Sequence, residues 1–229
     1  MNDYARLRTL MTSDATRLGV YGWVRDYLAG VVAGDVDADA VRHPLGFLCF
    51  PAWRDGVLGI CVHVWVDGAR ACPTTSPIHA HSWDLLSLVL YGAVANEIIE
   101  VSGPPTTPTH RIFEIHSDSD GDLVRATPGA VGYRVRSRQV FGRGEIYTLP
   151  RGVFHVSDVR GPAATVVLGE YRPGCPDRSL GTLTTEDHWV HRISCATRES
   201  VHAAQLVLDR MADQAASRDL EERCDRATS

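Results

Sequence analysis

Histidines in two short segments are the residues of this chain best suited to chemistry. His79 and His81 are separated by one residue, and His155 follows a turn at Pro150 and Gly152. On a β-strand, residues two apart project from the same face, so His79 and His81 can bind one metal ion together. The chain re-enters a sheet at His155, which supplies a third imidazole. Three imidazoles form a ligand set suited to Fe, Zn, Cu or Ni.

These two segments resemble the two motifs of the cupin superfamily. The second motif, G-x5-P-x-G-x2-H-x3-N, is matched at Gly144, Pro150, Gly152 and His155, with Val159 in place of the terminal Asn. The first motif, G-x5-H-x-H-x3-E-x6-G, is matched at His79, His81 and Gly92, with Pro73 and Leu85 in place of its first Gly and its Glu. The resemblance implies a double-stranded β-helix, or jelly-roll barrel, with a metal site made by His79, His81 and His155.

The position of the missing glutamate decides how many protein ligands we expect. Leu85 stands where the motif has Glu, and Asp84 lies one residue too early. On a regular strand Asp84 faces away from His79, His81 and Leu85, because neighbouring residues point to opposite faces. We therefore expect a three-histidine site, with Asp84 as a fourth ligand only as the less favoured alternative.

A narrower resemblance is to cysteine dioxygenase and related thiol dioxygenases, which bind Fe(II) through three histidines. It covers roughly residues 45 to 173, where Trp65 precedes the segment from Ser76 to His81. The family's Ser, His and Tyr on a later strand correspond to Val167, Gly169 and Tyr171, so only the Tyr is kept. The resemblance therefore implies an iron centre, but it does not imply a thiol substrate. We expect L-cysteine to be a poor substrate, and Arg54 is the nearest candidate to bind a substrate carboxylate.

Composition narrows the class of protein. The chain has 229 residues, 44% of them apolar and 22% charged, which is typical of one soluble domain with added helices. All 23 basic residues are Arg, which excludes Lys Schiff-base chemistry and a P-loop. The net charge is −5 without a basic run, so nucleic acid is not an expected partner. The sequence contains no apolar run of about 18 residues, so a membrane is not an expected partner either. The first residues lack a signal-peptide pattern, and the six cysteines are scattered, so we expect a cytoplasmic protein with free thiols.

The pattern of apolar residues divides the chain into three segments. Residues 1–44 are expected to be a helical segment that packs on the barrel, with helical spacing over 3–33 and Asp14 as a helix N-cap. Residues 45–175 are expected to form an all-β cupin barrel, and residues 176–229 a C-terminal extension with a helix from about 197 to 222. The expected strands are 46–51, 57–66, 85–91, 94–101, 111–116, 131–140, 146–149 and 165–171, with a turn at Thr127, Pro128 and Gly129.

Strand alternation predicts which polar groups reach a substrate. If His79 and His81 face inward, Ser87 and Tyr91 follow on the same face; Ser157 shares the face of His155, and Tyr171 that of Gly169. Ser87, Tyr91, Ser157 and Tyr171 are therefore the predicted catalytic or substrate-binding groups. The alternative for Ser87 and Ser157 is that they only fill space.

Other polar residues admit two interpretations each. Arg134, Arg136 and Arg138 alternate along one strand, which favours a solvated face over an anion-binding interior. His63 is expected in the core or at the rim of the barrel. His188 and His191 flank Trp189 at helix-like spacing and would cover the barrel mouth.

Together these features predict a mononuclear non-haem Fe(II) dioxygenase. Its substrates would be O2 and a small polar metabolite that chelates the metal. The first alternative is a redox-neutral lyase or isomerase that uses Zn, Mn or Ni, with Tyr91 or Tyr171 as the acid or base. The second is a non-catalytic protein that binds a small molecule. A homodimer is compatible with all three.

Overall fold

The computed structural model describes residues 1–13, 17–67, 74–103, 107–118 and 121–227, and it describes side chains as far as residue 213. In chain order its elements are α1 (Asp3–Thr12), α2 (Leu18–Ala33), β1 (Val41–His43), β2 (Phe47–Asp55), β3 (Leu58–Trp65), β4 (His79–Ala80), β5 (Trp83–Tyr91), β6 (Ala93–Ser102), β7 (His110–Ser117), β8 (Asp122–Gly142), β9 (Ile146–Leu149), β10 (His155–Asp158), β11 (Ala163–Tyr171), β12 (Asp177–Thr182), β13 (His188–Val190), β14 (Ile193–Ser194) and α3 (Thr197–Ala227).

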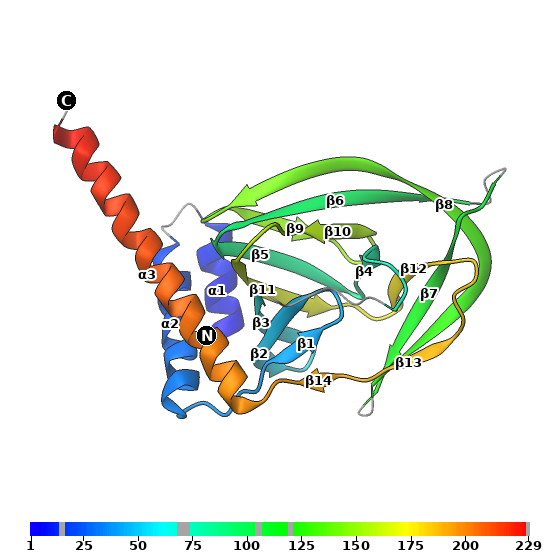
Figure 1. Ribbon diagram of the computed structural model, residues 1–229, viewed down its shortest axis with the longest axis horizontal. Helices are drawn as coiled ribbons and strands as arrows, with labels where there is room; N and C mark the ends of the chain where they lie inside the picture. Colours follow the sequence, from blue (N-terminus) through cyan, green and yellow to red (C-terminus); the bar gives the residue numbers. More distant parts are fainter. Residues whose placement is uncertain (14–16, 68–73, 104–106, 119–120, 228–229) are drawn as a thin grey trace.

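The described strands form two antiparallel sheets (Figure 1). The first sheet has the order β14, β1, β2, β3, β11, β5, β9, and the second has the order β13, β8, β6, β10, β4, β12, β7. The long strand β8 pairs with β6 through its second half and with β7 through its first half, so it arches around one end of the second sheet.

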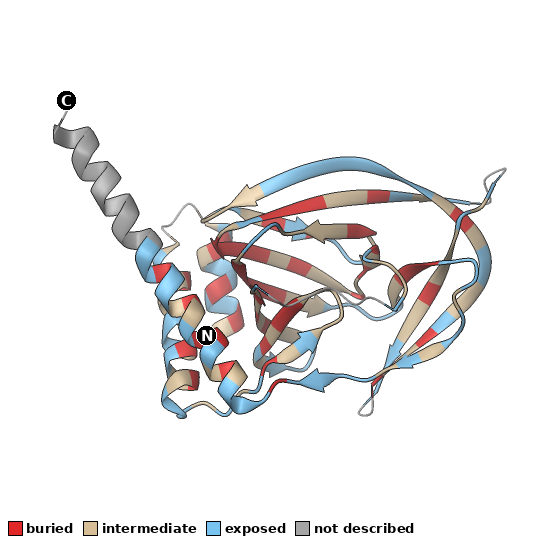
Figure 2. Cartoon of the chain, in the orientation of Figure 1, coloured by how far each residue is buried: buried red, intermediate tan, exposed pale blue. Residues whose placement is uncertain are grey.

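The three helices cover the outer face of the first sheet. Side chains of α1, α2 and α3 pack with residues of β2, β3, β5 and β11 in one apolar cluster, and the helix sides that face this sheet are buried (Figure 2). Each large aliphatic side chain buried there contributes about 1.5 to 3 kcal/mol. The Asn2 side chain caps α1 by accepting from Ala5 N at 2.9 Å, and Gly34 ends α2 in a left-handed conformation with φ of 80°.

The predicted antiparallel fold with helices at both ends is confirmed. The predicted strand 146–149 matches β9, and α3 begins at Thr197 as expected. Strands β1, β12 and β13 lie outside residues 45–175 and pair with strands inside that range, and β14, also outside it, pairs with β1. Asp14, the predicted helix N-cap, lies outside the described residues. Among the described helices, none combines the length and apolar character needed to span a membrane.

Two local predictions are wrong. Thr127, Pro128 and Gly129 do not end a strand, because β8 continues through them. They form a bulge opposite Ile112, whose carbonyl accepts a hydrogen bond from Thr127 Oγ1 at 2.9 Å. The segment containing His188 is the strand β13 rather than a helical turn, and His188 lies opposite Val124 of β8.

The neutral ring of His43 gives a testable pH dependence of stability. This ring stacks on Phe47 with 4.3 Å between ring centroids, and its Nδ1 accepts a hydrogen bond from Leu45 N. Burial, followed by the nearby His63, lowers the pKa of His43 from 6.5 to about 4. Between those pH values the unfolded chain binds the proton and the folded chain does not, so stability falls as pH drops from 6.5 toward 4.

The variant His43→Asn should weaken this pH dependence, because Asn does not titrate and its side-chain oxygen can still accept from the residue two positions on. Between pH 7 and pH 4, wild type should lose up to about 3 kcal/mol more unfolding free energy than the variant, measured by urea denaturation of metal-free protein. The control is His116→Asn, at an exposed position, which should behave as wild type. Equal pH dependence in His43→Asn and wild type would contradict the assignment.

Candidate metal centre

Pairing between β4 and β10 brings the three histidines together. His155, the first residue of β10, lies directly opposite His79 in β4, and His81 follows one residue after β4 ends. The ring centroids of His79 and His155 are 4.2 Å apart, and those of His81 lie 4.8 and 5.1 Å from them. One nitrogen from each ring lies within 4.8 Å of the other two. The chain therefore folds so that these imidazoles can bind one metal ion.

Backbone carbonyls fix the tautomers of two of the rings. Nδ1 of His79 lies 2.9 Å from the Pro77 carbonyl, and Nδ1 of His155 lies 3.0 Å from the Val153 carbonyl. A carbonyl oxygen can only accept, so both Nδ1 atoms carry the proton. Nε2 is then left with a free lone pair on each ring. This arrangement of outer hydrogen bonds is the one that orients metal-binding histidines.

Burial keeps the three rings neutral. It lowers the pKa of His79 and of His81 well below the ordinary value, and the neighbouring imidazoles lower both further. Burial also lowers the pKa of His155. All three rings are therefore unprotonated at neutral pH, which metal binding requires.

No carboxylate accompanies these rings among the described residues. Leu85 is buried in the apolar cluster between the two sheets, and Asp84 points to the other face of β5. The Asp84 carboxylate accepts from Arg151 N at 3.0 Å and pairs with Arg172 Nε at 3.3 Å. These contacts lower the pKa of Asp84, the Arg151 amide contributing most. The structure thus places Asp84 where strand alternation predicts it, away from the three histidines.

Trp83 forms one wall of the site. Its ring lies against His81, with 4.3 Å between centroids and 31° between planes. On the other side it packs over Gly169, where an added Cβ would lie 2.9 Å from the indole. Because Gly169 has no side chain, it leaves room for the Trp83 ring.

A buried polar group lies deeper between the sheets. Ser87 is on the inner face of β5, directly opposite Tyr147 of β9. The Tyr147 hydroxyl lies near Ser87, Thr165 and Asn96, and burial raises the pKa of this phenol. Ser87 Oγ, Thr165 Oγ1 and Asn96 Nδ2 have no hydrogen-bond partner of good geometry among the described residues. Ser157 Oγ donates to Asn96 Oδ1 at 2.9 Å.

This group confirms the face predicted for Ser87 and Ser157, and it adds three residues that the sequence analysis missed. Asn96, Tyr147 and Thr165 lie on three different strands. Alternation along each strand points each of these side chains toward the interior. Only the pairing of the strands shows that the three side chains lie close together.

The two predicted tyrosines lie in different parts of the structure. The prediction that Tyr91 faces the histidines is wrong, because Leu90 forms a bulge against β11 and reverses the alternation. Tyr91 is buried beneath the helices, and burial raises its pKa to about 12. Tyr171 is 46% exposed and lies opposite Trp83, at the rim of the histidine site.

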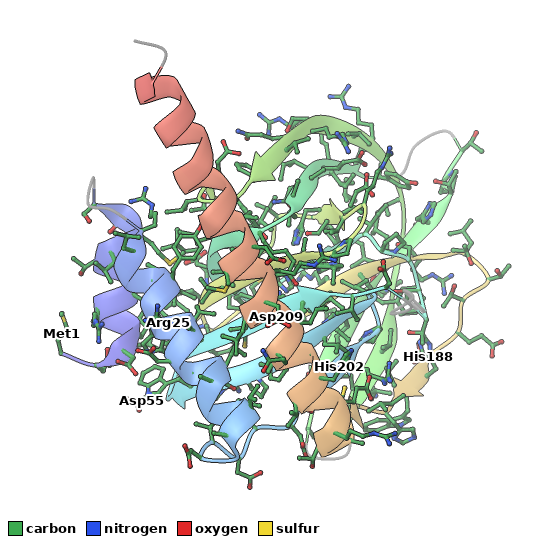
Figure 3. The ribbon with its side chains drawn as sticks, turned by 60° about the vertical axis from the view of Figure 1, so that its left-hand side comes forward. Met1, Arg25, Asp55, His188, His202 and Asp209 are labelled. Atoms are coloured by element: carbon green, nitrogen blue, oxygen red, sulfur yellow. The ribbon has the colours of Figure 1, made fainter. Side chains whose placement is uncertain are left out.

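The other predicted groups lie apart from the three histidines. Arg134, Arg136 and Arg138 are exposed, and Arg134 and Arg138 pair with Glu100 and Glu97, as expected for a solvated face. Neither of the described donor groups that could hold a metal contains His188 or His191. In Figure 3, His188 lies at the opposite side of the view from Met1, beyond the helix that carries His202 and Asp209.

Solved structures that resemble this chain include cupins. An RmlC-like cupin from Shewanella frigidimarina is 12% identical over 60% of this chain and 86% of its own, with a TM-score of 0.36. A cupin superfamily protein from Desulfitobacterium hafniense is 10% identical over 55% and 78%, with a TM-score of 0.32. A hydroquinone 1,2-dioxygenase from Sphingomonas sp. is 16% identical over 52% of this chain and 63% of its own, with a TM-score of 0.30.

The aligned region spans less than two thirds of that dioxygenase chain. No protein-family model matches this chain, and no curated protein does either. At these values the similarity says nothing about activity. Conclusions about function therefore depend on the residues of the site.

Removing any one of the three imidazoles should abolish binding at this centre, because the facial arrangement needs all three. In titrations of untagged protein with Co(II), His79→Ala, His81→Ala and His155→Ala should each lose the visible absorption bands of an ion bound by imidazoles without thiolate. Asp84→Asn should keep them. Loss of the bands in Asp84→Asn as complete as in the histidine variants would show that a carboxylate belongs to the centre.

Adding a methyl group behind Trp83 should disturb the site without touching a histidine. Gly169→Ala forces the indole toward His81, so metal affinity should fall roughly tenfold. The matched control is Gly59→Ala: Gly59 lies directly opposite Gly169, but an added Cβ there meets only the Trp53 carbonyl oxygen, at 3.8 Å. Competition with a chromophoric chelator measures both affinities. Equal affinity in the two variants would contradict this role of Trp83.

Proposed function

We propose that this protein is a mononuclear non-haem Fe(II) dioxygenase that acts on a small anionic metabolite able to chelate the metal. The observation that carries the proposal is the donor set: three neutral imidazoles, with Leu85 where a carboxylate would stand. Fe(II) bound by three neutral ligands keeps its full positive charge and would supply redox chemistry and open positions for an anionic substrate and O2. A set of nitrogen donors without thiolate or carboxylate fits this ion.

The inner residues suit a reaction that must exclude water. Leu85, Val89 and Val167 pack with Tyr147 in the cluster between the sheets. An apolar lining that excludes water strengthens the electrostatic interactions of a bound anion and limits side reactions. Above it, Trp83 shields His81 from one side.

The unpartnered polar atoms supply a place for the substrate's own polar groups. Ser87 Oγ and Thr165 Oγ1 are wholly buried without a partner of good geometry among the described residues, which is costly unless a ligand satisfies them. Tyr147 is held in its protonated form by burial, so its hydroxyl is a hydrogen-bond donor beside them. We assign Ser87, Thr165 and Tyr147 to substrate binding, and Tyr171 to the rim.

Arg54 is the cation best placed to attract an anionic substrate. It lies opposite Gly59, which lies opposite Gly169, so the three form one row across the inner face of the first sheet. Two glycines in this row leave space beside an exposed guanidinium. The row leads toward Trp83 and the histidines.

A redox-neutral lyase or isomerase is the second candidate, and the buried, protonated Tyr147 phenol favours it, because such a phenol can donate a proton to a substrate that a Lewis-acid metal holds. Small hydroxy, keto and amino acids that can chelate a metal should be screened, with L-cysteine as a thiol control that we expect to be consumed poorly. For a substrate so found, turnover should need Fe(II) and O2, and label from 18O2 should enter the product.

Strict anaerobiosis should stop the reaction, and a Zn-loaded protein should be inactive. Full activity of the Zn form without O2 would replace the dioxygenase by the redox-neutral enzyme. Tight binding of a metabolite with no turnover in either form would show that the protein is a binding module.

A further inference from the structure

A second group of metal-binding side chains lies on the inner face of the first sheet. Cys61 and His63 are two residues apart on β3, so they project from the same face. Cys49 of β2 lies directly opposite His63. The two sulfur atoms and one His63 nitrogen all lie within 4.8 Å of one another. This group is separate from His79, His81 and His155, which belong to the second sheet and its edge.

We propose that Cys49, Cys61 and His63 form a second metal site, which takes a thiophilic d10 ion, Zn2+ or Cu+. Two thiolates and one imidazole are soft to borderline ligands, which favour these ions over Fe(II), Mn or Mg. Trigonal binding with metal–sulfur bonds of about 2.3 Å needs sulfur atoms roughly 4 Å apart, so the group needs only a small inward shift.

The strand register argues against a disulfide at this place. Cys49 lies opposite His63 and Cys61 lies opposite Pro51, so the two cysteines are diagonal neighbours. Diagonal residues of an antiparallel pair lie about 7 to 8 Å apart, whereas a disulfide needs Cα atoms within about 6.8 Å. A bridging ion spans the longer separation without moving either strand.

Aromatic rings hold the imidazole in place. The ring of Phe47 lies 4.5 Å from that of His63, and Trp65 lies edge-on at 6.2 Å. His43 in turn stacks on Phe47. These contacts limit the rotation of His63, so the nitrogen that faces the sulfurs is pre-positioned, and the apolar rings exclude competing water from one side of the site.

The number of protein ligands in this group determines what each ion could do there. No fourth His, Cys, Asp or Glu joins this group among the described residues. Three protein ligands complete the coordination of Cu+, whereas Zn2+ would keep a fourth position for water or another small ligand. The two ions therefore predict different chemistry at the same three residues.

Titration with Co(II) tests the site, because cobalt bound to thiolate shows a sulfur-to-metal charge-transfer band that a histidine site lacks. Wild type and His79→Ala should show the band. Cys49→Ser and Cys61→Ser should lose it, with roughly a hundredfold fall in affinity. The matched control is Cys175→Ser, because Cys175 is a free, half-buried thiol outside this group whose Sγ donates to the Pro176 carbonyl; it should retain the band. Absence of the band in wild type, or its survival in both Cys49→Ser and Cys61→Ser, would overturn the proposal.

A measurement on the wild-type chain does not depend on the folding of variants. Added Zn2+ or Cu+ should protect Cys49 and Cys61, but not Cys175, from alkylation mapped by peptide mass. Competition with a zinc chelator and with a Cu+ chelator then identifies the ion, as the one that the protein retains. No protection by either ion, or a Cys49–Cys61 disulfide in protein prepared without reductant, would overturn the site. Failure of this test leaves the three-histidine centre unaffected, because that centre is measured by the bands of cobalt bound without thiolate.

Discussion

The cross-strand pair of His79 and His155 is the contact on which the centre depends. Antiparallel pairing of β4 and β10 sets these two residues directly opposite each other, and the carbonyls of Pro77 and Val153 fix their rings. Both carbonyls lie two residues before the histidine that they orient. The same local backbone shape is therefore used twice, once on each strand, and it presents two Nε2 lone pairs to one point.

Much of the site follows from alternation along single strands. The sequence places His79 and His81 together, turns Asp84 away and turns Ser87 inward, and the structure agrees. Alternation fails at Tyr91 because Leu90 bulges against β11. Nothing within β5 marks that bulge, since both residues are apolar and typical of a strand. It arises from the register with a partner more than 70 residues away, which one strand's own pattern does not contain.

Long-range pairing also explains the parts of the fold that the sequence did not predict. β4, β13 and β14 have only two or three residues each, too few for a periodic pattern. Taken alone, Pro128 and Gly129 predict a turn. Because the residues on both sides of them pair with β7, β8 continues through this segment, and the two residues form a bulge instead of a turn. Tyr147, Thr165 and Asn96 illustrate the same limit, because their meeting requires the order of strands in both sheets.

The two donor groups share one interior, and their chemistry keeps them distinct. Burial lowers the pKa of His79 and of His81, and the nearby His43 and His63 lower both further, so the interior favours neutral rings at this centre. In the three-histidine centre no carboxylate belongs to the donor group among the described residues, because residue 85 is Leu and Asp84 is turned outward. Under the proposed function, a cation there would obtain its compensating negative charge from a bound substrate. At the second group the thiolates themselves supply that charge, so an ion there can be neutralised by the protein alone. On these two proposals, one interior would hold a centre that depends on an anionic substrate beside a centre that does not.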